Sequence, residues 1–187
     1  ENIQMDNAHP AHLWFFRFIN NIIPVSKHGV ALINLSLLLS LLVAILFIFL
    51  ILRRYKLPVW YAVIVSLIIL FLSPQLGRFK EHLELAYLFF IPMWWYFLLK
   101  FSDRKTAWLW GGLLVNTAIL AGFISQWYLA IYFLFLTAIL ISHLLISPRE
   151  SSKRLKAGIN LFLMAIVPVI VVRLALFLND PFTGRPG

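Results

Sequence analysis

An uncharged apolar run over residues 30–52 most constrains what this chain can fold into. Its only polar side chains are those of Asn34, Ser36 and Ser40. A helix rises about 1.5 Å per residue, so roughly 23 residues cross the hydrocarbon core of a bilayer. The run therefore predicts a transmembrane helix. The basic cluster at residues 53–56 predicts that this helix ends on the cytoplasmic side.

The composition extends this prediction to the whole chain. Of its 187 residues, 62% are hydrophobic and 12% are charged, whereas soluble domains are about 45–50% apolar and about 25% charged. With a mean hydropathy of +0.91, the chain is predicted to be a multi-span membrane protein. Its net charge of +9 does not indicate nucleic acid, because most basic residues follow the ends of apolar runs. The absence of cysteine excludes disulfides and thiolate nucleophiles.

The apolar runs and their prolines predict six spans and one shorter helix. The shorter helix, over residues 11–23, lies between Pro10 and Pro24 and is expected to rest in the interface plane of the membrane. Pro92 is expected to kink the third span. The six predicted spans cover residues 30–52, 59–73, 85–100, 106–124, 127–147 and 157–178.

The predicted fold class is therefore all-α: a polytopic membrane bundle of about six transmembrane helices with an N-terminal interfacial helix. We expect an extracytoplasmic segment over residues 1–28, the bundle over 29–178 and the start of an extracytoplasmic loop over 179–187. The chain begins at Glu1 without a signal peptide and ends in turn-forming residues. We therefore expect it to be a fragment of a longer protein.

Alternation of the spans predicts the orientation. It gathers ten of the sixteen basic residues into three loops on one side, which the positive-inside rule assigns to the cytoplasm. These ten are Arg53, Arg54, Lys56, Lys100, Arg104, Lys105, Arg149, Lys153, Arg154 and Lys156. Most acids and histidines then fall on the other side, so the chemistry is expected on the extracytoplasmic face of a plasma (inner) membrane.

The segment before the interfacial helix contains Asp6, His9 and His12 at headgroup level. A carboxylate there can act as a general base, and a histidine can exchange a proton with a phosphate. Alternatively, Asp6 and Asn7 cap the helix and the histidines are simply solvated. The spacing is also compatible with a divalent cation. No Walker loop, dinucleotide fingerprint, GxSxG or HExxH motif is present, so no other cofactor is predicted.

A second polar cluster, over residues 78–84, falls on the same predicted face. Its cations Arg78 and Lys80 are able to hold a phosphate, while His82 or Glu84 moves a proton. The alternative is a solvated loop or helix start without a binding role.

Arg173 lies about five residues inside the outer end of the sixth span. It either snorkels to the interface or faces a cavity as a phosphate ligand. Asn34, Asn116 and Asn160 are expected to hydrogen-bond between helices. The aromatic cluster at residues 94–96 is interpreted as packing.

The order of these parts resembles that of bacterial membrane glycosyltransferases of the GT-C superfamily, relatives of the dolichyl-phosphate-mannose-dependent mannosyltransferases. The resemblance is in DNAHP at residues 6–10, the interfacial helix, the long span, the basic loop, SPQLGR at 73–78, His82 and LxxAY at 83–87. It covers most of the chain with short motifs. It implies transfer of a sugar from a polyprenyl-phosphate-linked donor to an extracytoplasmic acceptor, in glycosylation of the cell envelope.

The resemblance also implies roles for particular residues. Asp6 would be the base or position the acceptor, with His9 beside it, and Arg78, Lys80 and Arg173 would hold the lipid phosphate. The chain departs from the family pattern because the first membrane helix and the start of the first outer loop are absent. If Glu1 is a truncation point, the family's leading acid lies outside this chain.

Two other functions are compatible with the sequence. A lipid or solute transporter or flippase segment would act without catalysis, and it predicts ionisable residues near the bilayer midplane and discontinuous helices. A membrane assembly subunit would only bind a partner through its outer loops.

Asp180, in the last nine residues, is a further candidate for the glycosyltransferase site.

Overall fold

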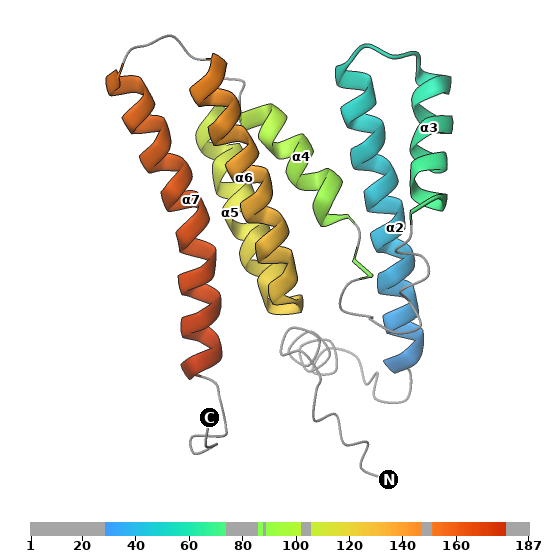
Figure 1. Ribbon diagram of the computed structural model, residues 1–187. Helices are drawn as coiled ribbons and strands as arrows, with labels where there is room; N and C mark the ends of the chain where they lie inside the picture. Colours follow the sequence, from blue (N-terminus) through green and yellow to red (C-terminus); the bar gives the residue numbers. More distant parts are fainter. Residues whose placement is uncertain (1–28, 74–85, 88, 102–105, 147–150, 179–187) are drawn as a thin grey trace.

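The computed structural model describes residues 29–73, 86–87, 89–101, 106–146 and 151–178, and in these ranges it is built of α-helices without strands. The described helices, labelled as in Figure 1, are α2 (Gly29–Arg54), α3 (Val59–Phe71), α4 (Phe90–Phe101), α5 (Ala107–Ile124), α6 (Gln126–Ile146) and α7 (Ser151–Leu178). The predicted all-α fold class is confirmed. The predicted interfacial helix over residues 11–23 lies outside the described residues.

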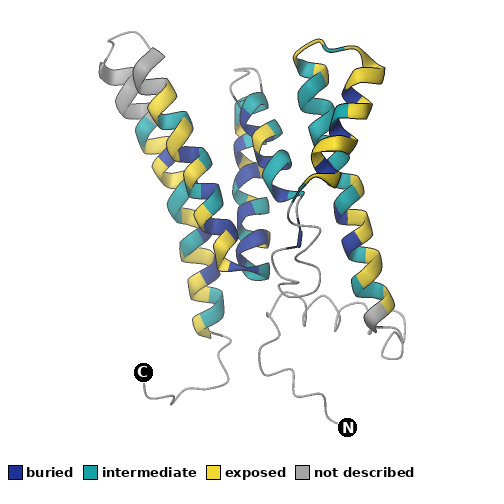
Figure 2. Ribbon diagram, turned by 45° about the vertical axis from the view of Figure 1, so that its right-hand side comes forward, coloured by how far each residue is buried: buried dark blue, intermediate teal, exposed yellow. Residues whose placement is uncertain are grey.

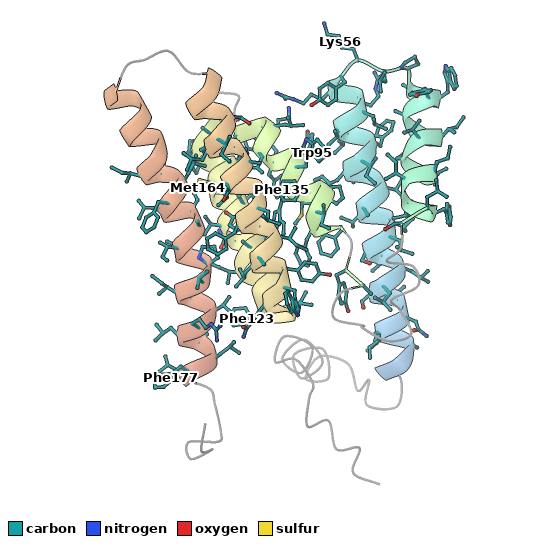
Figure 3. The ribbon with its side chains drawn as sticks, viewed as in Figure 1. Lys56, Trp95, Phe123, Phe135, Met164 and Phe177 are labelled. Carbon is teal, nitrogen blue, oxygen red and sulfur yellow. The ribbon has the colours of Figure 1, made fainter. Side chains whose placement is uncertain are left out.

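Successive helices run in opposite directions along a common axis (Figure 1). One end of the bundle, called here the basic end, carries Arg53, Arg54, Lys56 and the last turn of α4 with Lys100. The start of α5, the end of α6 and the start of α7 lie at the same end. Figure 3 shows Lys56 at the basic end and Phe177 at the opposite end. The alternation predicted from the apolar runs is therefore the one observed.

Three of the described helices are long and apolar enough to cross a membrane, namely Ala31–Arg54, Ala107–Ile124 and Gly158–Leu178. Their outward faces are apolar as well: Leu38 on α2 and Phe162 on α7 are both exposed. Figure 2 shows that exposed residues run along the outer sides of the bundle. In water such continuous apolar surfaces would be a liability, whereas in a bilayer they face hydrocarbon.

The helices α3 and α4 are shorter than predicted. With 13 residues and 12 residues, they extend about 20 Å and about 18 Å, less than the roughly 30 Å of a hydrocarbon core. Ala86 and Tyr87, predicted to be helical, are non-helical and buried. Figure 1 shows that both helices stop partway along the bundle, well short of the opposite end of α2.

The expected kink at Pro92 is wrong. Because α4 begins at Phe90, Pro92 lies in the first helical turn. The amide nitrogens of a first turn have no partner within the helix, so proline removes no helical hydrogen bond there. The prediction failed because it started the helix at residue 85, which would have placed Pro92 in its interior.

Trp94 is the centre of the buried core between α4, α5 and α6. Its side chain is fully buried, and its ring centroid lies 5.2 Å from that of Tyr132 on α6. Its Nε1 donates a hydrogen bond of 3.0 Å to Oγ1 of Thr117 on α5. Tyr96, two residues on, packs against Phe47 of α2 with a centroid distance of 5.8 Å. The interpretation of residues 94–96 as a packing cluster is confirmed.

α7 continues through Pro168 without interruption. Proline has no N–H, so Pro168 leaves the carbonyl of Met164, four residues earlier, without its helical donor. The Tyr132 hydroxyl of α6 lies 3.3 Å from this carbonyl and donates to it. A hydroxyl from a neighbouring helix thus replaces the missing backbone hydrogen bond, which is how prolines are accommodated in membrane helices.

Gly122 allows α5 to approach α7 closely. A Cβ atom at this position would lie 2.9 Å from Cγ2 of Val172 and 3.1 Å from the methyl groups of Leu129. Gly112, on the same helix, would meet nothing within 4 Å. Only one of these two helical glycines is therefore required by packing.

The expectation that Asn116 bonds between helices is wrong. Its Nδ2 donates to the carbonyl of Gly112 in the same helix at 2.8 Å, and the residue is exposed. A polar side chain on a helix surface without a facing partner satisfies itself by bonding back to the preceding turn.

Replacement of Tyr132 by Phe is expected to lower the free energy of unfolding by about 0.6–1.7 kcal/mol, the range typical of interhelical hydrogen bonds in membranes. The Met164 carbonyl would then lack a donor. In a Pro168→Ala background, which restores the backbone N–H, the same replacement should cost less. Denaturant unfolding in mixed micelles measures both differences, and equal costs in the two backgrounds would contradict the role assigned to Tyr132.

Replacement of Gly122 by Ala is expected to destabilise the bundle by about 1–3 kcal/mol, because the added methyl overpacks the contact of α5 with α7. Gly112→Ala is the matched control. It should stabilise the bundle by about 0.5–1 kcal/mol, because alanine has the higher helix propensity. Melting temperatures of the two variants should shift in opposite directions; a Gly122→Ala protein as stable as the parent would disprove the close approach.

Candidate functional site

The helix ends that adjoin the predicted site segments lie away from the basic end. Ser73 and Ala86 flank residues 74–85, Gly29 follows residues 1–28, and Leu178 precedes residues 179–187. In Figure 1 the corresponding ends of α2, α3, α4 and α7 all point away from the basic end. The three segments are thus attached at helix ends that face the same way.

Most of the predicted site residues belong to these segments and lie outside the described residues. They are Asp6, His9, Arg78, Lys80, His82 and Glu84. Their roles as base, proton carrier and phosphate ligands remain predictions. The structure describes the points at which their segments join the helices.

Tyr87 anchors the chain to α2 just before α4 begins. Its hydroxyl lies 3.1 Å from Oγ of Ser36 on α2, within hydrogen-bonding distance, and its side chain is only 7% exposed. Ala86 beside it is fully buried. The chain therefore approaches α4 from a position packed against α2.

Arg173 is the predicted site residue that the structure describes. It is exposed on α7, five residues before the end of that helix at Leu178. The neighbouring Val172 is buried close to Gly122 on α5, two residues before that helix ends. Arg173 thus lies near the opposite end of the bundle, from which a long side chain reaches the interface. Its predicted contact with a phosphate is untested.

An apolar groove of about 580 Å³ lies between α2, α3 and α4. At its inner end are Ala44 on α2, Leu70 and Ser73 at the end of α3, and Pro92 on α4. From there it runs along α2 to Tyr55 at the basic end, with Trp95 on its α4 wall. The dimensions and apolar lining suit a hydrocarbon chain and not a polar solute.

Small residues on α2 and α3 are the sequence signal for this groove. Ser40 and Ala44 on α2, and Ala62 and Ser66 on α3, are small residues four positions apart, and all four are buried. Such spacing places small side chains on one helix face and allows close helix contact. The two hydroxyls bond within their own helices, Ser40 to Leu37 and Ser66 to Ala62. The large residues at the edges of this contact, such as Ile48 and Leu70, then line the groove.

The described ranges contain no group of three or more His, Cys, Asp and Glu side chains that would hold a metal ion. All seven acidic residues of the chain, including Asp6, fall outside them. The possible divalent cation at Asp6, His9 and His12 is therefore untested.

Comparisons with protein-family models, with curated proteins and with solved structures found no match to this chain.

The topology is testable by labelling, because the chain has no cysteine of its own. Single replacements Tyr55→Cys and Thr106→Cys lie at the basic end, whereas Trp127→Cys and Leu178→Cys lie at the opposite end. In intact spheroplasts, a membrane-impermeant maleimide should label only the second pair, because basic residues are retained in the cytoplasm. Labelling of Tyr55→Cys from outside would reverse the orientation, and labelling of one member of each pair would contradict the alternation.

Proposed function

We propose that this protein transfers a sugar from a polyprenyl-phosphate-linked donor to an acceptor on the extracytoplasmic side of a plasma membrane. The observation that carries the proposal is the direction of the chain. The helix ends next to residues 1–28, 74–85 and 179–187 all face away from the basic end. This direction supports the proposal, because the three polar segments that carry Asp6, Arg78 and Asp180 are attached at helix ends that face the same way.

The short α3 and α4 contribute to this arrangement. Both stop partway along the bundle, so the connection between Ser73 and Ala86 starts and returns there. A membrane-confined donor requires polar groups near the headgroup level, where its phosphate lies. A pair of truncated helices joined by a segment with Arg78, Lys80 and His82 suits that requirement better than two full spans with a minimal turn.

The proposed chemistry assigns each residue type a step. Asp6 accepts the proton of an acceptor hydroxyl while the acceptor oxygen forms a bond to the anomeric carbon of the donor sugar. The bond between that carbon and the phosphate oxygen breaks, and its electron pair stays on the polyprenyl phosphate. Arg78 and Lys80 stabilise the charge on this leaving group. Arg173 is a third cation near the same end.

The transporter alternative has less support. Its expected ionisable residues near the bilayer midplane do not occur among the described side chains, where Arg and Lys lie at helix ends, in last turns or, for Arg173, five residues before the end of α7. Its expected discontinuous helices are not observed in the described ranges either, because α7 runs through Pro168 as one helix. A site at one end of the bundle suits surface chemistry more than passage through it.

The test uses the purified protein in proteoliposomes with radiolabelled polyprenyl-phosphate sugars. Asp6→Asn removes the base but keeps the size of the side chain, so sugar transfer should fall by about 10²–10⁴-fold while donor binding is retained. Arg78→Gln should weaken donor binding. Lys100→Gln, which removes one charge at the basic end, is the matched control and should leave transfer unchanged.

Two results would contradict the proposal. Transfer that survives Asp6→Asn would assign the base to another residue. Movement of a lipid or solute across the bilayer, without transfer from any donor, would replace the glycosyltransferase by the transporter.

A further inference from the structure

One side of α5 is left uncovered by the described helices. α5 packs against α4, α6 and α7, and the residues that it buries are Gly111, Leu114, Ala118, Ala121 and Gly122. Another set of residues, on the other side of the helix, is exposed: Leu109, Leu113, Asn116 and Leu120. These four are called here the open face of α5.

The open face has the spacing of a seam between two helices. Its residues follow one another at intervals of four, three and four positions, the intervals at which side chains meet in a left-handed helix pair. From Leu109 to Leu120 the face extends about 16 Å along the helix. Gly112 lies one turn before Asn116 on the same side, and a Cβ atom there would meet nothing within 4 Å. The backbone of α5 is therefore accessible to a neighbouring helix at this point.

Asn116 lies near the middle of a membrane span. The span covers Ala107–Ile124, so about 12–14 Å of helix lies on either side of Asn116. Asn34 and Asn160 are exposed as well, but they lie only three and two residues from the start of their spans. Hydrocarbon therefore surrounds Asn116, whereas the other two asparagines are close to the headgroups. A carboxamide in hydrocarbon costs free energy unless it finds hydrogen-bonding partners.

The carboxamide of Asn116 has bonding capacity that its own helix does not use. One N–H of Nδ2 donates to the carbonyl of Gly112 at 2.8 Å. The second N–H and Oδ1 have no partner among the described residues. Lipid chains offer neither a donor nor an acceptor at this depth. The molecule that covers the open face is therefore expected to present both, opposite Asn116.

We infer that the open face of α5 binds a second copy of this chain, with the two Asn116 side chains facing each other across a two-fold axis along the membrane normal. A carboxamide is complementary to itself, because each one donates an N–H to the other and accepts one in return. Copies inserted in the same orientation hold Asn116 at the same depth. In coiled coils, a single asparagine in an apolar seam fixes the register and the number of strands in this way.

The observations favour a second copy over lipid and over a different helix. Lipid would leave the carboxamide unpaired. A different helix would need a donor and an acceptor at the same depth, with apolar side chains at the same intervals, whereas symmetry supplies both from a second copy. The inference is independent of sugar transfer, because the segments that carry Asp6 and Arg78 join α2, α3 and α4 and not α5.

The experiment measures the dimer dissociation constant of the purified protein by sedimentation equilibrium in density-matched detergent micelles. Asn116→Leu removes the paired carboxamides and should weaken association by about tenfold, although it makes the face more apolar. Asn116→Gln keeps a carboxamide and should stay within about threefold of the parent. Asn34→Leu, which removes an exposed carboxamide near the end of a span, is the matched control and should leave association unchanged.

Gly112→Ala separates the contact between copies from the stability of one copy. Within one copy the added methyl meets nothing, so the melting temperature in a large excess of detergent should rise, as expected above for this variant. Between copies the methyl holds the two helices apart and should weaken association by about threefold or more. Opposite effects on the two measurements distinguish an interface from a folding defect.

Cross-linking tests the same contact in membrane vesicles, because the chain has no cysteine of its own. Leu113→Cys and Leu120→Cys should form disulfide-linked dimers on mild oxidation, since residues of a symmetric seam meet their counterparts. Leu38→Cys on α2 and Phe162→Cys on α7 replace residues that are also exposed. They are the matched controls and should remain monomeric.

Three outcomes would overturn the inference. The first is a protein that sediments as a monomer at every protein-to-detergent ratio. The second is an Asn116→Leu protein that associates as tightly as the parent, which would leave the contact to leucines alone. The third is a Leu113→Cys disulfide with a different protein and not with a second copy, which would assign the open face to another partner.

Discussion

The bundle depends on the requirement that every backbone polar group in hydrocarbon finds a partner within the protein. The clearest case is the carbonyl of Met164, which Pro168 deprives of its helical donor and which Tyr132 supplies instead. Because this donor comes from α6, the continuity of α7 depends on its packing against a neighbour. The same Tyr132 ring lies against Trp94 of α4. One side chain therefore links three helices through a hydrogen bond and an aromatic contact.

The same requirement explains the short helices. α4 starts at Phe90, which places Pro92 in a first turn, where proline removes no helical hydrogen bond. Before this helix, the Tyr87 hydroxyl lies within hydrogen-bonding distance of the Ser36 hydroxyl on α2. α2 also packs against α3 through small residues, including Ala44, Ala62 and Ser66. The full-length α2 is thus the support on which the two truncated helices are arranged.

The parts of the fold that follow from composition and periodicity were predictable from the sequence. The helix over residues 30–52, the alternating helix directions and the packing role of Trp94 were all confirmed. The start of α4 was not predictable from the apolar run, because Ala86 and Tyr87 are as apolar as the helix they precede but are buried without being helical. The partner of Asn116 was also mispredicted, because periodicity cannot show whether a facing helix is present. The candidate acids and Arg78 fall outside the described residues, and the structure describes the helix ends to which their segments are attached.

The groove adjoins the points from which the 74–85 segment departs and to which it returns. Ser73 lines the inner end of the groove and is also the residue from which the segment with Arg78 departs. The opposite edge of the groove reaches Pro92, which follows the point where the same segment returns through Tyr87. Because α3 is held mainly by α2, the inner end of the groove and the residue from which the 74–85 segment departs depend on the same contact between two helices.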